Sequence, residues 1–146
     1  MQPQSPQNPD LRQLVEYARE AAQNAYAPYS KFRVGAALQL VNGEVVTGVN
    51  VENGSYGLTL CAERSALVRA VAKFGPSIRV AAVAIANLND VASPPCGACR
   101  QVLAEFIEPD APVAFPGTGG TLTLPFHEVL PLAFKMKLEP KQEPTP

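Results

Sequence analysis

The sequence predicts an α/β fold, a three-layer α/β/α sandwich built on a five-stranded mixed sheet. Segments with helical and strand patterns alternate along the chain, which is typical of this class. Residues 78–86 form a nearly continuous run of Val, Ile and Ala, as expected for a central strand covered on both faces. The strand–helix–strand unit over 78–115 should be parallel and right-handed. At 146 residues with 47% apolar side chains, the chain should form one domain around one core.

The first half predicts a helix followed by a hairpin. Asp10 is a candidate N-cap for a helix that runs to about Ala25. Its apolar residues fall on one face at helical spacing: Leu11, Leu14, Val15, Ala18, Ala21, Ala22 and Ala25. Strands are expected at 33–41 and 44–52. Between them, Asn42-Gly43 predicts a two-residue turn with positive φ at both positions, and hence an antiparallel pair.

The second half predicts three helices and three strands. A helix should span 61–74 and end at Gly75-Pro76, before the central strand. Pro94-Pro95 then leads into a helix from Cys96 to about Ile107. Short strands at 111–115 and 121–124 should be antiparallel, because the glycine-rich link 117–120 is too short for a helical crossover. A last helix is expected over about 127–134.

Composition excludes several classes of protein. The net charge is −1, and 12 Lys and Arg are dispersed among 13 acids, which argues against a nucleic-acid binder. No apolar run is long enough for a membrane helix. The first residues lack the basic start and apolar stretch of a signal peptide, so we expect a cytoplasmic protein. The proline-rich ends, 1–9 and 138–146, should be disordered, leaving 10–137 as the folded domain.

All three cysteines lie in two short segments, each at an expected helix start. The first is Cys61-Ala62-Glu63-Arg64, and the second, residues 94–100, contains Cys96 and Cys99. An odd cysteine count with a C-x-x-C spacing in a reducing compartment favours metal binding or catalysis over disulfides. A first-turn position lowers a thiol's pKa. Three sulfurs with an open fourth position are typical of a catalytic zinc site, so we expect one zinc ion (Zn2+) per chain.

Charged side chains next to the cysteines suggest further roles. Glu63 is too close to Cys61 to be a comfortable fourth ligand, but it can reach a water at the metal and move protons there. Three thiolates outweigh the charge of zinc, so a cation should lie beside them. Arg64 and Arg100 are both candidates for donating to the sulfurs, with Arg64 the first choice.

Three other interpretations stay open at this point. Cys96 and Cys99 alone could form a redox pair, although this leaves Cys61 and Glu63 without a purpose. A closed structural zinc site would need His127, the single histidine. A zinc-stabilised interaction module without catalysis would make Glu63 dispensable.

The cysteine segments resemble those of the zinc-dependent cytidine deaminases, in the short form in which a cysteine replaces the first histidine ligand. Further stretches also resemble this family, namely 26–35, 50–56 and 130–134, and the resemblance covers about residues 11–135. It implies a cytidine deaminase-like fold. It also implies hydrolytic deamination of cytidine and deoxycytidine to uridine and deoxyuridine, with release of ammonia, as in pyrimidine salvage.

The resemblance also implies a role for individual residues. Zinc would be held by Cys61, Cys96 and Cys99. Glu63 would take a proton from the water at zinc, give it to N3 before attack at C4, and then protonate the departing amino group. The nucleoside would be contacted by Asn50 and Glu52 at the ribose, by Gly54, Tyr56 and Phe32 around it, and by the Ala62 N–H at O2. Phe134 would reach the base from a neighbouring subunit, in a homotetramer with shared active sites.

Three further points bear on the resemblance. Gly54 stands where the family often has alanine, which would loosen that loop. A related deaminase acting on blasticidin S would use the same base chemistry with a different pocket around residues 50–56. Deamination of bases within DNA or RNA is disfavoured because the chain has no basic track.

Overall fold

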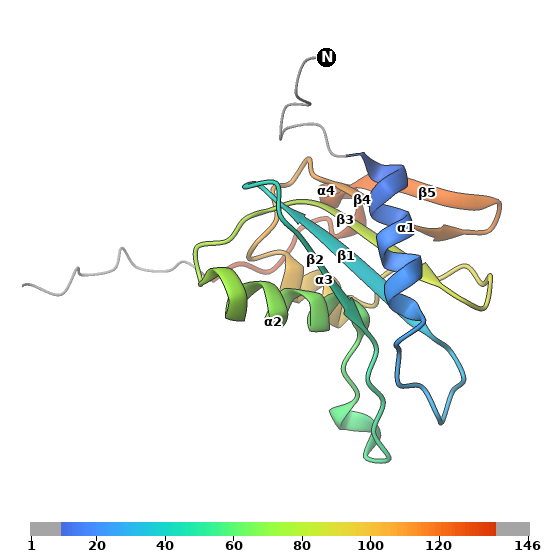
Figure 1. The fold of residues 1–146 in the computed structure, drawn as a ribbon. Coiled ribbons are helices and arrows are strands. Elements are labelled where there is room, and N and C mark those ends of the chain that lie inside the picture. Colours follow the sequence, from blue (N-terminus) through green and yellow to red (C-terminus); the bar gives the residue numbers. More distant parts are fainter. Residues whose placement is uncertain (1–9, 137–146) are drawn as a thin grey trace, which may run out of the picture.

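A computed structural model describes residues 10–136, and the ends for which disorder was predicted lie outside the described residues. The elements follow in the predicted order (Figure 1). They are α1 (Leu11–Ala22), β1 (Val34–Leu40), β2 (Val45–Val49), the short 3₁₀ turn η1 (Tyr56–Leu58), α2 (Ala62–Phe74), β3 (Val80–Asn87), α3 (Gly97–Leu103), β4 (Pro112–Gly117), β5 (Gly120–Pro125) and α4 (Phe126–Val129). No helix within residues 10–136 is both long and apolar enough to cross a membrane.

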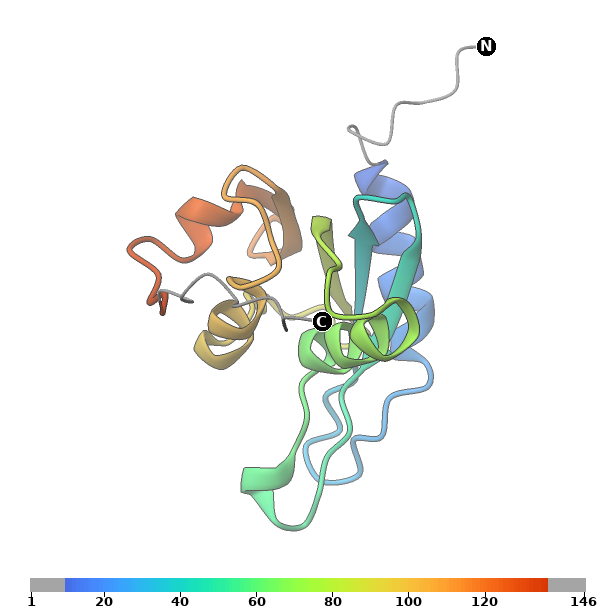
Figure 2. The same cartoon turned by 90° about the vertical axis from the view of Figure 1, so that its left-hand side faces the viewer.

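The sheet confirms the predicted five-stranded mixed architecture. Its strand order is β2-β1-β3-β4-β5. β1 is antiparallel to both of its neighbours, β3 and β4 are parallel, and β4 and β5 are antiparallel. α1 covers one face, whereas α2, α3 and α4 pack on the other (Figure 2). The chain therefore has the three layers that the sequence predicted.

β3 shows how its sequence builds two different interfaces. Because side chains alternate across a strand, the alanines at 82, 84 and 86 face α1, while Val83 and Ile85 join the larger cluster under α2 and α3. All five side chains are buried. The run of Val, Ile and Ala thus predicted correctly a strand covered on both faces.

Two glycines let helices approach the sheet closely. A Cβ atom added at Gly35 would collide with the backbone of α1 at Ala18 and Ala22. One added at Gly48 would lie 2.6 Å from the Ala62 carbonyl oxygen and would also collide with the Ala66 backbone. The first turn of α2 therefore rests directly on β2, with no side chain between them.

We expect Gly48→Ala to lower the free energy of unfolding by about 2 kcal/mol or more, since the methyl group overpacks a backbone-to-backbone contact. Urea unfolding measures this change. Gly57→Ala is the matched control, because the space around Gly57 is open. Equal stability of the two variants would contradict this description of the α2–β2 contact.

The hairpin between β1 and β2 differs from the expected one. Only Gly43 has a positive φ, of 90°, and the turn is made by Val41 and Asn42. The Gly43 N–H donates to the Leu40 carbonyl at 2.9 Å, and the Leu40 N–H donates to the Glu44 carbonyl at 2.8 Å. Asn42 Oδ1 accepts from the Glu44 N–H at 2.9 Å, which stabilises Asn42 without positive φ. The predicted two-residue turn was wrong: the loop is one residue longer, with Gly43 as its left-handed residue.

The last helix is much shorter than predicted. α4 ends at Val129, and Leu130 already has φ −136° and ψ 81°. Pro131 explains this end, because a proline disfavours helical geometry in the residue before it. Leu132 then has a φ of 53°, so the prediction of a helix to residue 134 was wrong. α3 also ends earlier than predicted, at Leu103.

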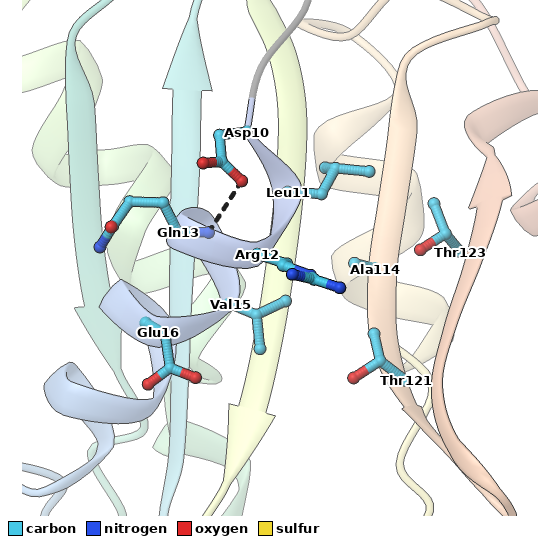
Figure 3. Close-up of a pocket in the computed structure, with 9 residues that line it drawn as sticks. All are labelled: Asp10, Leu11, Arg12, Gln13, Val15, Glu16, Ala114, Thr121 and Thr123. Carbon is cyan, nitrogen blue, oxygen red and sulfur yellow. Dashed lines mark hydrogen bonds between the residues drawn. The ribbon is translucent and has the colours of Figure 1, made fainter.

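A cavity of about 630 Å³ lies where α1 leaves part of β4 and β5 uncovered (Figure 3). Leu11 and Val15 line it from the helix, and Thr121 and Thr123 line it from β5. Asp10 borders it too, but its Oδ1 caps the helix by accepting from the Gln13 N–H at 3.3 Å. None of the cysteines lines this space. Despite its size, we do not assign the chemistry of the protein to it.

Candidate metal centre and active site

The fold brings both cysteine segments to the same end of the sheet. β2 and β3 run in the same direction, because each is antiparallel to β1. α2 follows β2 and α3 follows β3, so both helices begin at this end. Cys61 and Cys96 are the N-cap residues and have nearly identical backbone angles, φ −73° and ψ 157° against φ −67° and ψ 161°. Neither makes a side-chain capping bond, which leaves both sulfurs free to face the other helix.

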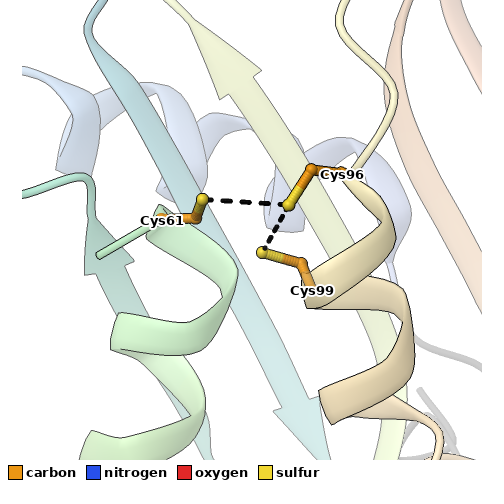
Figure 4. Close-up of side chains that lie close together, drawn as sticks. All are labelled: Cys61, Cys96 and Cys99. Carbon is orange, nitrogen blue, oxygen red and sulfur yellow. Dashed lines mark hydrogen bonds between the residues drawn. The ribbon is translucent and has the colours of Figure 1, made fainter. Parts of the chain in front are cut away.

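The three sulfurs converge on one point (Figure 4). Cys96 Sγ lies 3.9 Å from Cys61 Sγ and 3.4 Å from Cys99 Sγ, and all three lie within 4.8 Å of one another. None is in a disulfide. Tetrahedral zinc with sulfur ligands at 2.3 Å requires sulfurs about 3.8 Å apart. The spacing and the thiolate chemistry therefore both fit one zinc ion.

The same geometry disfavours two of the alternatives. Cys61 is as much part of the cluster as the C-x-x-C pair, which a redox pair does not explain. His127 does not join the cluster, and its Nδ1 lies 2.9 Å from the Pro109 carbonyl oxygen instead. Within residues 10–136, no histidine joins the three cysteines as a fourth ligand, and the chain has no further cysteine. The cluster therefore does not form a closed structural zinc site. Cys99 is buried and Cys96 is exposed, so the cluster opens to solvent on the Cys96 side.

Of the two candidate arginines, only Arg64 contacts a sulfur. Its Nη2 donates to Cys61 Sγ at 3.4 Å. Its Nε is buried and has no hydrogen-bond partner among the described residues, so the guanidinium holds a further donor beside the sulfurs. The Cys99 thiol and the Arg64 guanidinium together lower the pKa of Cys61 to about 5, which favours a thiolate there.

Arg100 does not meet the expectation that it donates to a sulfur. Its Nε donates to the Pro95 carbonyl and its Nη1 to the Val129 carbonyl, both at 2.7 Å. It therefore ties the residue before Cys96 to the end of α4.

Glu63 lies in the first turn of α2 and is only 5% exposed. Burial raises the pKa of this carboxyl group, because a charge is less stable away from water. A buried carboxyl group beside a metal site can both accept and return a proton. Its burial distinguishes Glu63 from an exposed glutamate that only interacts favourably with the helix dipole.

The expected nucleoside contacts lie just beyond β2. Asn50 is buried, and its amide bridges two backbone groups: Oδ1 accepts from the Val34 N–H at 2.9 Å, and Nδ2 donates to the Phe32 carbonyl at 2.8 Å. Glu52 Oε1 accepts from the N–H groups of Tyr29 and Ser30 at 3.0 and 3.1 Å. Hydrogen bonds from Ser30 lower the pKa of Glu52 and favour its carboxylate form.

A cavity of about 370 Å³ lies beside Glu52 and is lined by Tyr29, Ser30, Asn53, Tyr56 and Thr59 as well. The rings of Tyr29 and Tyr56 meet edge to face, with centroids 6.3 Å apart. A Cβ atom added at Gly54 would lie 3.1 Å from Tyr29 Oη. The absent methyl group at Gly54 therefore makes room for a tyrosine hydroxyl.

Three further expected contacts differ in their exposure. Phe32 is half-buried, Ala62 is 1% exposed, and Phe134 is 69% exposed. The Phe134 carbonyl accepts from Gln101 Nε2 at 3.0 Å, which holds the backbone while the ring stays at the surface. Within a single chain Phe134 is therefore a surface residue and not part of the hydrophobic core.

A family model for the cytidine and deoxycytidylate deaminase zinc-binding region matches residues 9–114. The chain belongs to this deaminase family. A cytidine deaminase from Halalkalibacterium halodurans is 45% identical over 128 residues, which cover 86% of this chain and 94% of the relative. The crystal structure of a cytidine deaminase from Burkholderia pseudomallei has a TM-score of 0.76 at 44% identity, covering 84% of this chain and 98% of that one. A blasticidin-S deaminase from Bacillus cereus is 29% identical over 128 residues, 84% of this chain and 90% of the relative.

Membership of this family agrees with the zinc site, since the matching family model is a zinc-binding region and the three-sulfur cluster is compatible with one zinc ion. Sequence reasoning missed several contacts that build the candidate site. It did not anticipate that Tyr29 and Ser30 bind Glu52 through their backbone. It also passed over Asn87 and Asn89, which organise the loop before Cys96. The aromatic-rich stretch 26–32 was a signal that could have pointed to the contacts of Tyr29 and Ser30. The three asparagines or aspartates within 87–90 could have pointed to the role of Asn87 and Asn89.

Proposed function

We propose that this deaminase hydrolyses cytidine and deoxycytidine to uridine and deoxyuridine, releasing ammonia, as a step of pyrimidine salvage. One observation carries the proposal: three sulfurs suited to zinc lie within 4.8 Å of one another at the start of the helix that carries the buried Glu63. The similarity to curated cytidine deaminases over nearly their whole length supports the choice of substrate.

In this proposal Cys61, Cys96 and Cys99 hold the metal. Bound zinc supplies a water molecule that loses a proton near neutral pH. Glu63 would accept that proton and deliver it to N3 of the pyrimidine while the deprotonated oxygen bonds to C4. It would then take the proton of the new C4 hydroxyl group and pass it to the amino nitrogen, so that the C4–N bond breaks, ammonia leaves and the carbonyl group of the product forms. The buried position of Glu63 keeps bulk water from competing for the proton. Arg64 offsets part of the negative charge of the sulfurs through its contact with Cys61.

Residues after β2 hold the ribose in this proposal. Oε1 of Glu52 is occupied by Tyr29 and Ser30, so Oε2 is the oxygen that accepts from a sugar hydroxyl. Asn50 Nδ2 carries a second N–H besides the one given to Phe32, and this is the donor for the sugar. Phe32 packs beside the nucleoside, Gly54 and Tyr56 complete the wall, and the Ala62 N–H binds O2 of the base.

The proposal includes a homotetramer in which Phe134 completes the active site of a neighbouring subunit. The high exposure of its ring in a single chain supports this, because a phenylalanine at the surface leaves apolar area uncovered. The remainder of the site comes from residues 32–99 of one chain. Residues 10–137 would form the whole catalytic domain.

The alternative substrate is a nucleoside-like compound such as blasticidin S. It is favoured less, since identity to the blasticidin-S deaminase is 29% against 45% for the cytidine deaminase. A steady-state assay of ammonia release with cytidine, deoxycytidine and blasticidin S as separate substrates decides between them. We expect turnover with both nucleosides. No ammonia from millimolar cytidine with the zinc-loaded protein would reject the proposal.

A further inference from the structure

Asn87 is the last residue of β3 and is only 2% exposed, yet no step of the reaction uses it. Its Nδ2 donates to the Val91 carbonyl at 2.7 Å and to Ser93 Oγ at 2.9 Å. Its Oδ1 accepts from the N–H groups of Asn89 at 3.0 Å and Val91 at 3.3 Å. An amide has two donors and two acceptor positions, so the whole capacity of this side chain is used on one loop, residues 88–93.

This loop leads directly to a zinc ligand. Ser93 is three residues before Cys96, and its own N–H donates to the Pro116 carbonyl at 2.9 Å. Pro94 and Pro95 lie between them, and proline fixes φ, so the connection is stiff. Because the connection is stiff, the contact that fixes the position of Ser93 also restricts the position of Cys96.

The same loop also reaches the nucleoside side of the site through Asn89. Its Oδ1 accepts from the Arg33 N–H at 3.3 Å, and its Nδ2 donates to the Lys31 carbonyl at 3.2 Å. These two residues flank Phe32, whose carbonyl accepts from Asn50. Asn89 thus holds the backbone that in turn holds a ribose contact of the proposed site.

The loop at 88–93 and the loop that contains Phe32 each include one residue with an unfavourable backbone conformation, which other contacts must stabilise. Lys31 has a φ of 60° and Asp90 a φ of 52°. Residues other than glycine seldom adopt this left-handed conformation, although aspartate tolerates it better than lysine does, and it persists where surrounding contacts fix it. Asn89 bonds directly to Lys31 and precedes Asp90, so it contacts one left-handed residue and adjoins the other.

We propose that Asn87 and Asn89 are positioning residues that join the two halves of the active site. Asn87 sets the segment that carries Cys96, and Asn89 sets the segment that carries Phe32 and orients Asn50. Asn87 acts through backbone groups and the Ser93 hydroxyl, Asn89 acts through backbone groups, and neither is placed to touch metal or substrate. The role of Asn89, which we call the substrate half of the inference, rests on the proposed function. The role of Asn87, which we call the zinc half, does not.

The test compares Asn87→Ala and Asn89→Ala with Asn42→Ala. Asn42 is the matched control, since its Oδ1 also accepts a backbone N–H two residues ahead, but in the hairpin at the opposite end of the sheet. Zinc affinity is measured by competition with a chromogenic chelator, and kcat and KM are measured with cytidine. The loss of a group bonded directly to a metal ligand typically costs ten- to a hundredfold in affinity. Asn87 acts on Cys96 through Ser93, so we expect a loss at the lower end of that range, about tenfold, in Asn87→Ala. In Asn89→Ala we expect KM to rise about five- to tenfold, with little change in kcat or zinc affinity.

A purely structural role predicts a different pattern, in which both variants unfold at lower temperature while zinc affinity and KM stay at the values of Asn42→Ala. That pattern overturns the inference, as does an equal loss of zinc affinity in both variants.

Ser93→Ala is a second variant, which keeps the test decisive if Asn87→Ala does not fold. It removes a single hydrogen bond of Asn87 from a less buried position, and it should also weaken zinc binding. If the wild-type protein released no ammonia from cytidine, the proposed function would fail, while unequal zinc affinities of Asn87→Ala and Asn42→Ala would still support the zinc half.

Discussion

Replacing Glu63 by glutamine should lower kcat for cytidine by about three orders of magnitude or more, because one general acid–base group typically contributes 10²–10⁴-fold and Glu63 handles successive proton transfers. Glutamine keeps the shape of the side chain but cannot take up the proton. The fold should persist, since a neutral amide at this buried position is no harder to desolvate than a carboxylate. Zinc content should also persist, because Glu63 is not among the clustered ligands.

The measurement combines steady-state kinetics with metal analysis of the same preparation. Glu128→Gln is the matched control, since Glu128 is also a first-turn glutamate, in α4, but is exposed and has no cysteine near it in the sequence. It should retain the wild-type rate. Near-normal turnover in Glu63→Gln would contradict the assigned proton transfers and would favour the interaction module without catalysis.

Replacing Cys99 by alanine should remove zinc from the protein and reduce turnover to background. Cys99 is fully buried within the cluster, so solvent does not readily replace its sulfur as a ligand. The loss of zinc affinity should exceed the ten- to hundredfold that is typical for an outer partner of a metal ligand. A ligand raises the melting temperature of a protein only if the folded state binds it. Added zinc should therefore raise the melting temperature of the wild type but not that of Cys99→Ala.

Metal analysis and thermal unfolding with and without zinc provide two independent readouts of this change. Ala98→Ser is the control, since Ala98 lies in the same turn of α3 but is exposed. It should bind zinc like the wild type. If Cys99→Ala still held one zinc ion per chain and still deaminated cytidine, the three-thiolate site would be wrong.

The parts of the fold that were predictable are those that depend on local patterns. Val, Ile and Ala over 78–86 could be buried only between two layers, and β3 is found there. Cys61 and Cys96 were expected at helix starts, and the parallel course of β2 and β3 explains why two such starts meet. The preference for Arg64 over Arg100 agrees with the placement of the two side chains. That preference was based only on the position of Arg64 next to Glu63. Spacing along the chain did not reveal that Arg100 binds the carbonyl groups of Pro95 and Val129 instead of a sulfur.

The parts that were not predictable depend on contacts between distant segments. The length of the hairpin loop depends on whether Asn42 bonds to Glu44, which the dipeptide Asn-Gly does not determine. The need for glycine at position 48 comes from the backbone of α2, which lies across β2 only in the folded chain. Asn89 binds Lys31 and Arg33 across more than fifty residues of sequence. No local pattern carries that information.

Titration of the metal-free protein with zinc, while uridine formation from cytidine is followed, tests the central claim most directly. Zinc is added in steps to protein kept reduced and freed of metal by a chelator, because oxidised cysteines do not bind it. If three thiolates hold one catalytic ion beside Glu63, activity should start near zero, rise in proportion to the zinc added, and stop rising at about one zinc ion per chain. Activity that is already complete without zinc, or that does not appear at one zinc ion per chain, would contradict it.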